Sequence, residues 1–228
     1  MTERAQALVT GASKGVGEAV ARALAPTHDV ILGGRDKEAL AALAAELPGA
    51  RAWPVELTQV SAADVAGVER LDVLVHSAGV ATLGPIADQG ADVWRRTMEI
   101  NVVAVAELTR LLLPALRRAE GHVVCVNSGA GLRANPEWAS YAASKFALRA
   151  FADALRLEEP ALRVTTVYPG RIATDMQRGV RAHEGGEFEP EKYLRPETVA
   201  RALLAAVTAG PDAHLPELTV RPRGGPVN

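Results

Sequence analysis

Two side chains that could transfer a proton lie four residues apart in Ser140-Tyr141-Ala142-Ala143-Ser144-Lys145. The surrounding residues 138–158 are rich in Ala, Leu, Phe and Arg and predict a helix, on which positions i and i+4 share one face. A free tyrosine titrates near ~10 and is a poor acid or base at neutral pH. The ammonium of Lys145 should lower the pKa of Tyr141 and make its phenol useful for proton transfer. The same spacing also occurs by chance on solvated helix faces, so its meaning depends on the rest of the chain.

A hydroxyl group and a buried amide would complete such a site. Ser128 follows residues 121–127, a continuous apolar run typical of a buried parallel strand, and ligands of open α/β sheets bind at the carboxyl ends of strands. Asn101 lies inside a long predicted helix, residues 91–119, where Asn is a mediocre residue. It is therefore either a harmless surface position or the mark of a kink with a purpose. Pro114 should bend or end the same helix.

A glycine-rich turn follows the first predicted strand. The apolar residues 5–10 end in Gly11-Ala12-Ser13-Lys14-Gly15-Val16-Gly17, and residues 18–25 read as helix. Gly11 allows a tight turn, Gly15 lets a pyrophosphate approach the backbone, and Gly17 lets the helix lie close to the strand. The helix N-terminus would present free N–H groups to the anion. A glycine triplet can be a simple loop, but its place directly after a strand favours a dinucleotide site.

The end of the second predicted strand, residues 29–35, bears on the choice of nucleotide. An NAD site usually has an acidic residue there, but Gly34 occupies the position and Arg35 follows it. A guanidinium prefers a 2′-phosphate, and Lys14 would approach the same phosphate. Each cation alone could be a solvated surface charge; together they predict NADPH/NADP+ over NADH. Asp36, the expected N-cap of helix 36–47, would serve a ribose if the register differs by one residue.

The remaining segments predict the architecture. Strands are expected at residues 50–55, 71–75, 162–167 and 215–220, and helices at 60–68 and 196–209. Strands alternate with helices throughout, which predicts an α/β fold: one doubly wound parallel sheet of about seven strands with helices on both faces, in a single domain of residues 1–228. Residues 171–195 lack periodicity and would form a lid or a disordered loop.

Composition excludes several classes of protein. The formal net charge of −2 provides no basic field for nucleic acid and no polybasic membrane anchor. Cys125, the single cysteine, lies in an apolar run and reads as a buried thiol. His76 is better explained as a hydrogen-bonded histidine than as a metal ligand, because no cluster with ligand spacing accompanies it. Residues 1–4 contain no apolar signal core and no segment approaches 18 apolar residues, so we expect a soluble, cytoplasmic protein without a metal.

These residues together resemble the classical short-chain dehydrogenases/reductases along nearly the whole chain. Thr10-Gly11-x-x-x-Gly15-x-Gly17 looks like their cofactor motif, and Asn101, Ser128, Tyr141 and Lys145 fall in order on their catalytic tetrad. Pro169-Gly170, with Thr174 after it, looks like their nicotinamide-side motif. The resemblance implies a Rossmann-type fold and hydride transfer between nicotinamide C4 and a substrate carbon.

The resemblance also implies roles. Tyr141 would exchange a proton with the substrate oxygen, Lys145 would lower its pKa and hold the nicotinamide ribose, and Ser128 would hydrogen-bond the substrate oxygen. Asn101 would hold a water that links Lys145 to solvent. Residues expected to bind the cofactor are Gly11, Ser13, Lys14, Gly15, Val16, Gly17, Arg35, Glu56, Leu57, Ser77, Ala78, Gly79, Tyr141, Lys145, Pro169, Gly170, Ile172 and Thr174. Residues expected to bind substrate are Ser128, Ala130, Trp138 and Arg171, with residues 171–195 as the substrate loop.

The expected function is that of an NADPH-dependent reductase of small or medium-sized carbonyl compounds. An NAD-linked alcohol dehydrogenase and, from another class, a non-catalytic nucleotide-sensing protein remain alternatives. Leu132, Arg133 and Pro136 would also line the approach, so an acidic group on the substrate is conceivable unless Arg133 and Arg171 face water. His76-Ser77 stands where the family usually has Asn-Asn, which puts the hydrogen bonds from sheet to cofactor there in question.

The family resemblance implies a homodimer or homotetramer assembled through the two long helices. A small apolar set on the second of them could provide such a face or could pack on the sheet: Ala147, Ala150, Phe151, Ala154 and Leu155.

Overall fold

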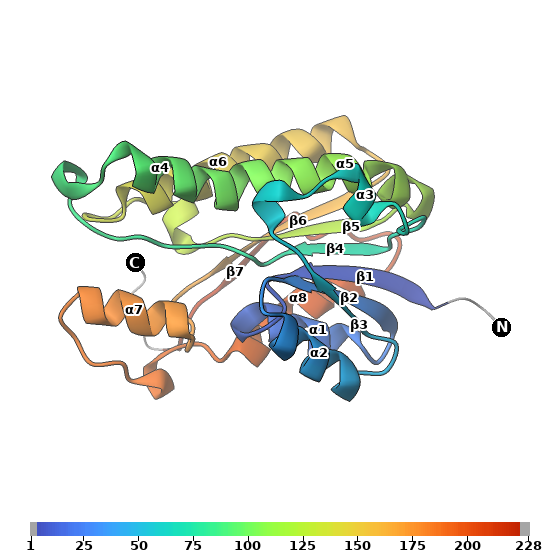
Figure 1. The fold of residues 1–228 in the computed structure, drawn as a ribbon, viewed down its shortest axis with the longest axis horizontal. Helices are drawn as coiled ribbons and strands as arrows, with labels where there is room; N and C mark the ends of the chain where they lie inside the picture. The colour runs from blue at the N-terminus through green and yellow to red at the C-terminus, as the bar shows by residue number, and fades with distance from the viewer. Residues whose placement is uncertain (1–3, 224–228) are drawn as a thin grey trace.

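The computed structural model describes residues 4–223; residues 1–3, part of the N-terminal stretch considered above, and residues 224–228 lie outside it. Seven parallel strands form one sheet in the order β3-β2-β1-β4-β5-β6-β7 (Figure 1). This confirms the predicted doubly wound sheet. The strands are β1 Ala5–Thr10, β2 His28–Gly34, β3 Arg51–Pro54, β4 Val73–His76, β5 His122–Val126, β6 Arg163–Pro169 and β7 Glu217–Val220.

Helices cover both faces of the sheet, and each layer encloses its own apolar core. Leu24, Leu40 and Leu203 bring α1, α2 and α8 against one face. Leu112 and Leu148 bring α5 and α6 against the other, together with α3 (Figure 1). The helices are α1 Gly15–Leu24, α2 Lys37–Glu46, α3 Ala62–Val65, α4 Ala91–Met98, α5 Ala104–Ala119, α6 Ala139–Glu158, α7 Asp175–His183 and α8 Pro196–Val207.

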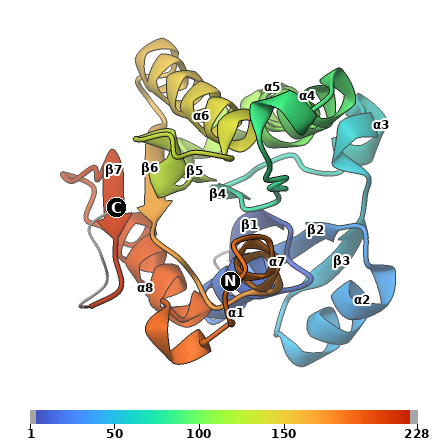
Figure 2. The same cartoon turned by 90° about the vertical axis from the view of Figure 1, so that its left-hand side faces the viewer.

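The strand register brings the carboxyl ends of the strands to a common edge. Thr10 pairs with Gly33, His76 with Cys125, and Pro169 with Val220. Residues that directly follow the strands, among them Gly11 and Ser77, therefore meet at this edge. Figure 2 looks onto this end of the molecule, with α4 and α6 above the sheet and α7 and α8 below it.

The helix expected over residues 91–119 is interrupted. A π-helical turn, η3 (Glu99–Val103), separates α4 from α5 and contains Asn101, which is fully buried. A π turn accommodates one extra residue and often marks a functional position. Of the two readings of Asn101, the structure rules out the surface position. Pro114 lies inside α5, which continues to Ala119, so it does not end the helix.

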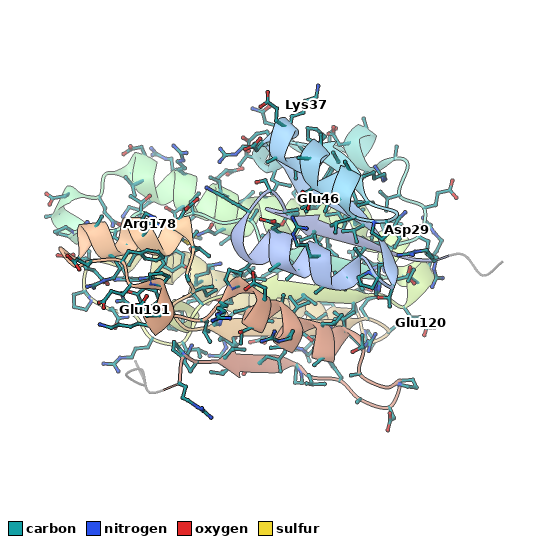
Figure 3. The ribbon with its side chains drawn as sticks, turned by 90° about the horizontal axis from the view of Figure 1, so that it is seen from below. Asp29, Lys37, Glu46, Glu120, Arg178 and Glu191 are labelled. Carbon is teal, nitrogen blue, oxygen red and sulfur yellow. The ribbon has the colours of Figure 1, made fainter. Side chains whose placement is uncertain are left out.

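The segment without periodicity is partly helical. Thr174 caps the N-terminus of α7 by accepting a hydrogen bond from the backbone N–H of Gln177, and a short 3-10 turn, η5 (Pro190–Lys192), follows. Only Gln177 and Val180 of α7 are buried, so the apolar pattern was too sparse to predict it. Figure 3 shows Arg178 of α7 and Glu191 at the opposite end of the molecule from Glu120. Within residues 4–223 we find no helix with the length and hydropathy that a membrane crossing requires.

Candidate active site

One cleft of about 1650 Å³ runs across the carboxyl edge of the sheet. Every residue expected to bind cofactor or substrate lines this cleft, as do three of the four expected catalytic residues, Ser128, Tyr141 and Lys145. Asn101, the fourth, is buried and does not line the cleft. Leu132, expected at the approach, does not line the cleft and is 38% exposed. The fold therefore gathers residues from almost the whole chain into one continuous space.

The glycine turn adopts a conformation that other residues would resist. Gly11 and Gly15 have φ values of 67° and 61°, in the left-handed region. A Cβ on Gly17 would lie 2.1 Å from the carbonyl oxygen of Gly11, so only glycine lets α1 begin this close to the turn. The N-terminus of α1 faces the cleft, where its free N–H groups and dipole favour an anion. This cradle fits the diphosphate of a dinucleotide.

Thr10, absent from the expected site residues, ties the turn to the next strand exit. Its hydroxyl accepts hydrogen bonds from the backbone N–H groups of Ser77 and Ala78, at 3.1 and 3.2 Å. A Cβ on Gly11 would lie 2.9 Å from Ala78 N, so the glycine turn and the segment that follows β4 are in direct contact. The sequence signals for Thr10 were its place at the head of the glycine motif and at the end of an apolar strand.

The two cations expected at a 2′-phosphate point in different directions. Arg35 is exposed at the end of β2, with Nη1 3.9 Å from Oε2 of Glu56. Lys14 instead pairs with Asp175, Nζ to Oδ2 at 3.1 Å. Thr174 is the side chain nearest to a Cβ built on Gly15, so the start of α7 lies on the glycine turn and brings this carboxylate within reach. Lys14 and Arg35 thus have separate carboxylate partners in this structure, and a 2′-phosphate shared by the two cations stays a prediction.

Asp36, the alternative ribose ligand, has a structural role. Its carboxylate accepts a hydrogen bond from the backbone N–H of Ala39 at 3.0 Å and caps α2, as predicted. Gly34 stands at the strand end, where a Cβ would be 3.9 Å from Ser13 Oγ. The position that an acidic residue would need for a ribose is thus occupied by a glycine.

Tyr141 and Lys145 lie on the buried face of α6. They are 7% and 5% exposed, and Lys145 Nζ lies 5.7 Å from the centroid of the phenol ring. The ammonium donates a hydrogen bond to the carbonyl oxygen of Val126 at 3.1 Å. Ser128 stands where β5 leads into η4 (Gly129–Gly131), and its Oγ accepts from the backbone N–H of Ala130 at 3.1 Å.

Burial decides the protonation of this pair. It raises the pKa of Tyr141 above its usual value near 10, and a hydrogen bond with the Ser128 side chain opposes the rise. It lowers the pKa of Lys145 to about 8, which still leaves the amine charged at neutral pH. The expected lowering of the tyrosine pKa is therefore wrong here, because loss of hydration outweighs the hydrogen bond with Ser128. The phenol stays protonated and can act as an acid.

Asn101 positions the groups around the pair. Its amide donates to Val80 O at 2.9 Å and to Ser144 Oγ at 3.0 Å, while its Oδ1 accepts from Val80 N at 2.9 Å. Ser144 in turn donates to the carbonyl oxygen of Tyr141 at 2.7 Å. The π turn is thereby joined to the exit of β4 and to α6. The expected water between Asn101 and Lys145 stays a prediction.

Asn127 supports the site in a similar way but was not predicted. Its amide donates to Lys145 O at 3.0 Å and its Oδ1 accepts from Ser128 N at 2.8 Å. One side chain therefore fixes the strand end that carries Ser128 against the helix that carries Lys145. The sequence signal for Asn127 was its place as a polar residue at the end of an apolar strand.

The His76-Ser77 departure leaves the cleft intact. His76 Nε2 lies 2.8 Å from Thr109 Oγ1 in α5, a hydrogen bond that places the ring away from the cleft. Burial lowers the pKa of His76 to about 3 and keeps the ring neutral. The hydrogen-bonded role expected for His76 is confirmed. The structure describes no group of three or more His, Cys, Asp or Glu side chains, within residues 4–223, that could hold a metal ion.

At the substrate end, Trp138 packs edge-on against Tyr141, with ring centroids 5.7 Å apart. Ala130 forms the adjoining apolar wall. The guanidinium of Arg171 donates two hydrogen bonds to the carboxylate of Glu184 at 2.6 and 2.7 Å, and its contact with substrate stays a prediction. Arg181 donates to the same carboxylate.

Comparison with known proteins gives a consistent result. The family model described as short chain dehydrogenase matches residues 5–185. Glycine betaine reductase ATRR of Emericella nidulans is 36% identical over 239 residues, which cover 97% of this chain but 19% of that protein. The chain thus spans about a fifth of that relative. An uncharacterized short-chain type dehydrogenase/reductase, y4eK of Sinorhizobium fredii, is 35% identical over 96% of this chain and 91% of its own length.

Solved structures share the fold. An alcohol dehydrogenase from Thermococcus sibiricus, complexed with 5-hydroxy-NADP, superposes with a TM-score of 0.87 at 25% identity over 97% of both chains. A variant of actinorhodin polyketide ketoreductase with NADPH gives 0.85 at 27% identity, over 96% of this chain and 95% of that chain. A short chain dehydrogenase from Shigella flexneri, complexed with NADP, gives 0.84 at 29% identity, over 95% and 96%.

Proposed function

Because the chain belongs to the classical short-chain dehydrogenases/reductases, and is thus an NAD(P)-dependent oxidoreductase, we propose that it uses NADPH to reduce a small or medium-sized carbonyl compound to an alcohol. The observation that carries the proposal is the meeting of Tyr141, Lys145 and Ser128 in the same cleft as the glycine turn. The solved relatives that contain NADP or NADPH support the choice of cofactor.

We assign each part of the cofactor to residues that line the cleft. The glycine turn and the N-terminus of α1 would bind the diphosphate, Arg35 the 2′-phosphate, and Glu56 and Leu57 the adenine. Lys145 would hold the nicotinamide ribose, together with Ser77, Ala78 and Gly79 after β4. The end of β6 and the segment after it would hold the nicotinamide, through Pro169, Gly170, Ile172 and Thr174.

The reduction needs one proton for the oxygen and one hydride for the carbon. The reduced nicotinamide, when bound, supplies the hydride. Tyr141 gives its proton to the carbonyl oxygen, and Ser128 donates a hydrogen bond to the same oxygen and stabilises its developing charge. Burial keeps the phenol protonated, which is the state that reduction requires. Lys145 carries the positive charge that stabilises the phenolate left behind.

Substitution of Tyr141 by phenylalanine tests the proposal. We expect Tyr141→Phe to lower carbonyl-dependent NADPH oxidation by roughly 10²- to 10⁴-fold, the usual contribution of a positioned acid. NADPH binding, followed by fluorescence, should persist, because the ring remains. Tyr168→Phe is the matched control: that phenol donates to Glu217 at 3.2 Å and does not line the cleft. Wild-type turnover in Tyr141→Phe would refute the assignment.

The assembly and the substrate loop belong to the same proposal. A homodimer or homotetramer would form through α5 and α6. Val103, directly before α5, and Phe146 of α6 are 48% and 43% exposed. Within the apolar set named from the sequence, Leu155 packs in the core and Phe151 packs partly against it, while Ala150 and Ala154 are exposed. Residues 171–195, with α7, form the loop that closes over the substrate, and the chain acts as one domain.

A further inference from the structure

Two arginines flank Gly129, the residue that follows Ser128. Arg221 comes directly after β7, and its Nη1 donates to the carbonyl oxygen of Tyr168 at 3.1 Å. A Cβ built on Gly129 would lie 3.3 Å from Nη2 and 3.4 Å from Nη1 of Arg221. The guanidinium therefore lies against the backbone of Gly129, next to the hydroxyl proposed to bind the substrate oxygen.

Arg133 is attached to the same residue through its backbone. It follows η4, and its backbone N–H donates to the carbonyl oxygen of Gly129 at 3.1 Å. Its side chain is exposed and lines the same cleft as Ser128 and Tyr141. The two arginines come from segments almost ninety residues apart in the chain.

Their charges are not balanced by neighbouring carboxylates. Several other arginines of the cleft are paired, among them Arg35 with Glu56 and both Arg171 and Arg181 with Glu184. Among the residues that the structure describes, no carboxylate lies within 4.0 Å of the guanidinium of Arg133 or Arg221. Glu191, a further acid of the cleft in η5, lies on the side of α7 (Figure 3), and Glu197 belongs to α8.

We propose that Arg221 and Arg133 bind a carboxylate of the substrate, so that the preferred substrates are oxo acids, aldehydes or ketones that carry a carboxylate. The inference rests on the proposed function, since it places the carboxylate beside the oxygen-binding Ser128. A guanidinium has five N–H donors in a planar fork that matches a carboxylate, and Arg221 spends one of its nitrogens on Tyr168. The sequence already indicated Arg133, together with Arg171, for an acidic group of the substrate, whereas it did not single out Arg221.

The test compares two aldehydes that differ in one charged group. Wild-type protein is assayed with NADPH and either 4-formylbenzoate or 4-formylbenzamide. We expect kcat/KM to be about tenfold higher for the acid, the size of a hydrogen-bonded charge pair. Arg221→Gln and Arg133→Gln should each remove most of this preference and leave the amide rate near wild type. Arg221→Lys, which keeps the charge but not the fork, should retain part of it.

Controls separate a lost subsite from a damaged fold. Arg201→Gln removes an exposed arginine of α8 that donates to Thr198 and does not line the cleft, so the preference should remain. Fluorescence titration of NADPH should give wild-type affinity in every variant. Arg133 makes no side-chain hydrogen bond or ion pair with residues 4–223, so Arg133→Gln tests the subsite even if Arg221→Gln is unstable.

The result that overturns the inference is equal kcat/KM for the two aldehydes, with no selective loss in either arginine variant. In that case the reductase function still stands, because Tyr141→Phe reports on it independently. If neither aldehyde is turned over, calorimetry with NADP+ and the alcohols 4-(hydroxymethyl)benzoate and 4-(hydroxymethyl)benzamide decides the matter. Binding of the acid no tighter than that of the amide overturns the inference.

Discussion

At the scale of single residues, we expect cofactor choice to depend on one exposed guanidinium. Arg35 faces the cleft beside Glu56, whereas Lys14 is held by Asp175. Gly34 offers no carboxylate, and Asp36 caps α2. The preference for NADPH over NADH should therefore rest on Arg35 rather than on both cations.

Arg35→Ala is expected to weaken NADPH binding by about tenfold, the loss of one charge-assisted contact, and to leave NADH binding nearly unchanged. Lys14→Ala is the matched comparison and should weaken both nucleotides to a similar, smaller extent, because its amine lies over the diphosphate turn. Fluorescence titration of both nucleotides measures these constants. Tighter binding of NADH than of NADPH by wild type, unaltered in Arg35→Ala, would favour the NAD-linked alternative.

Whether a site residue could be predicted from the sequence depends on whether its role is visible in local spacing. Tyr141, Lys145, Gly11 and Gly17 reveal themselves by local spacing, which a helix or a turn converts directly into geometry. Asn127 and Arg221 gave no such pattern, because their partners, Lys145 O and Tyr168 O, are distant in the chain. The direction of the Tyr141 pKa shift was also out of reach, since burial is a property of the folded chain.

At the scale of elements, the π turn η3 positions Asn101 beneath the active site. Its extra residue buries the Asn101 side chain, which exchanges two hydrogen bonds with the backbone of Val80. The sequence indicated only that Asn101 was unusual in a helix. Likewise, α7 escaped prediction because it buries few side chains and its polar contacts, such as Lys14–Asp175 and His183–Glu137, join residues that are distant in the chain.

Asn101→Ala should destabilise the protein by about 2 kcal/mol, because Val80 N and O and the Ser144 hydroxyl lose buried partners. Urea unfolding followed by circular dichroism measures the change. Asn135→Ala, an exposed position, should stay within about 0.5 kcal/mol of wild type. Equal stability of the two variants would show that the buried amide does not hold η3 in place.

At the scale of the whole molecule, two histidines in adjacent strands make stability depend on pH. His76 and His122 bond Thr109 and Thr165, and burial lowers the pKa of each to about 3. In the unfolded chain both would titrate near ~6.5. Between pH 6.5 and 3 the unfolded state therefore binds more protons, and the unfolding free energy falls as the pH falls.

The expected loss is about 2 kcal/mol per histidine at pH 5 relative to pH 7. Denaturant unfolding at a series of pH values measures it. His76→Gln and His122→Gln should each flatten the profile, and the double variant should flatten it by the sum of the two. If the double variant kept the wild-type pH dependence of the unfolding free energy, groups other than these two histidines would cause the loss of stability in acid.

The parallel pairing of β1 with β4 also governs how the protein is made. Ala7 pairs with Val73, and Thr10 receives its hydrogen bonds from Ser77 and Ala78, more than sixty residues later. A nascent chain on the ribosome therefore exposes one bare edge of β1 until β4 has been synthesised, a state prone to wrong pairing. The contact between the glycine turn and the segment after β4 cannot form earlier, and Tyr141 and Lys145 join the site only after α6 has been synthesised.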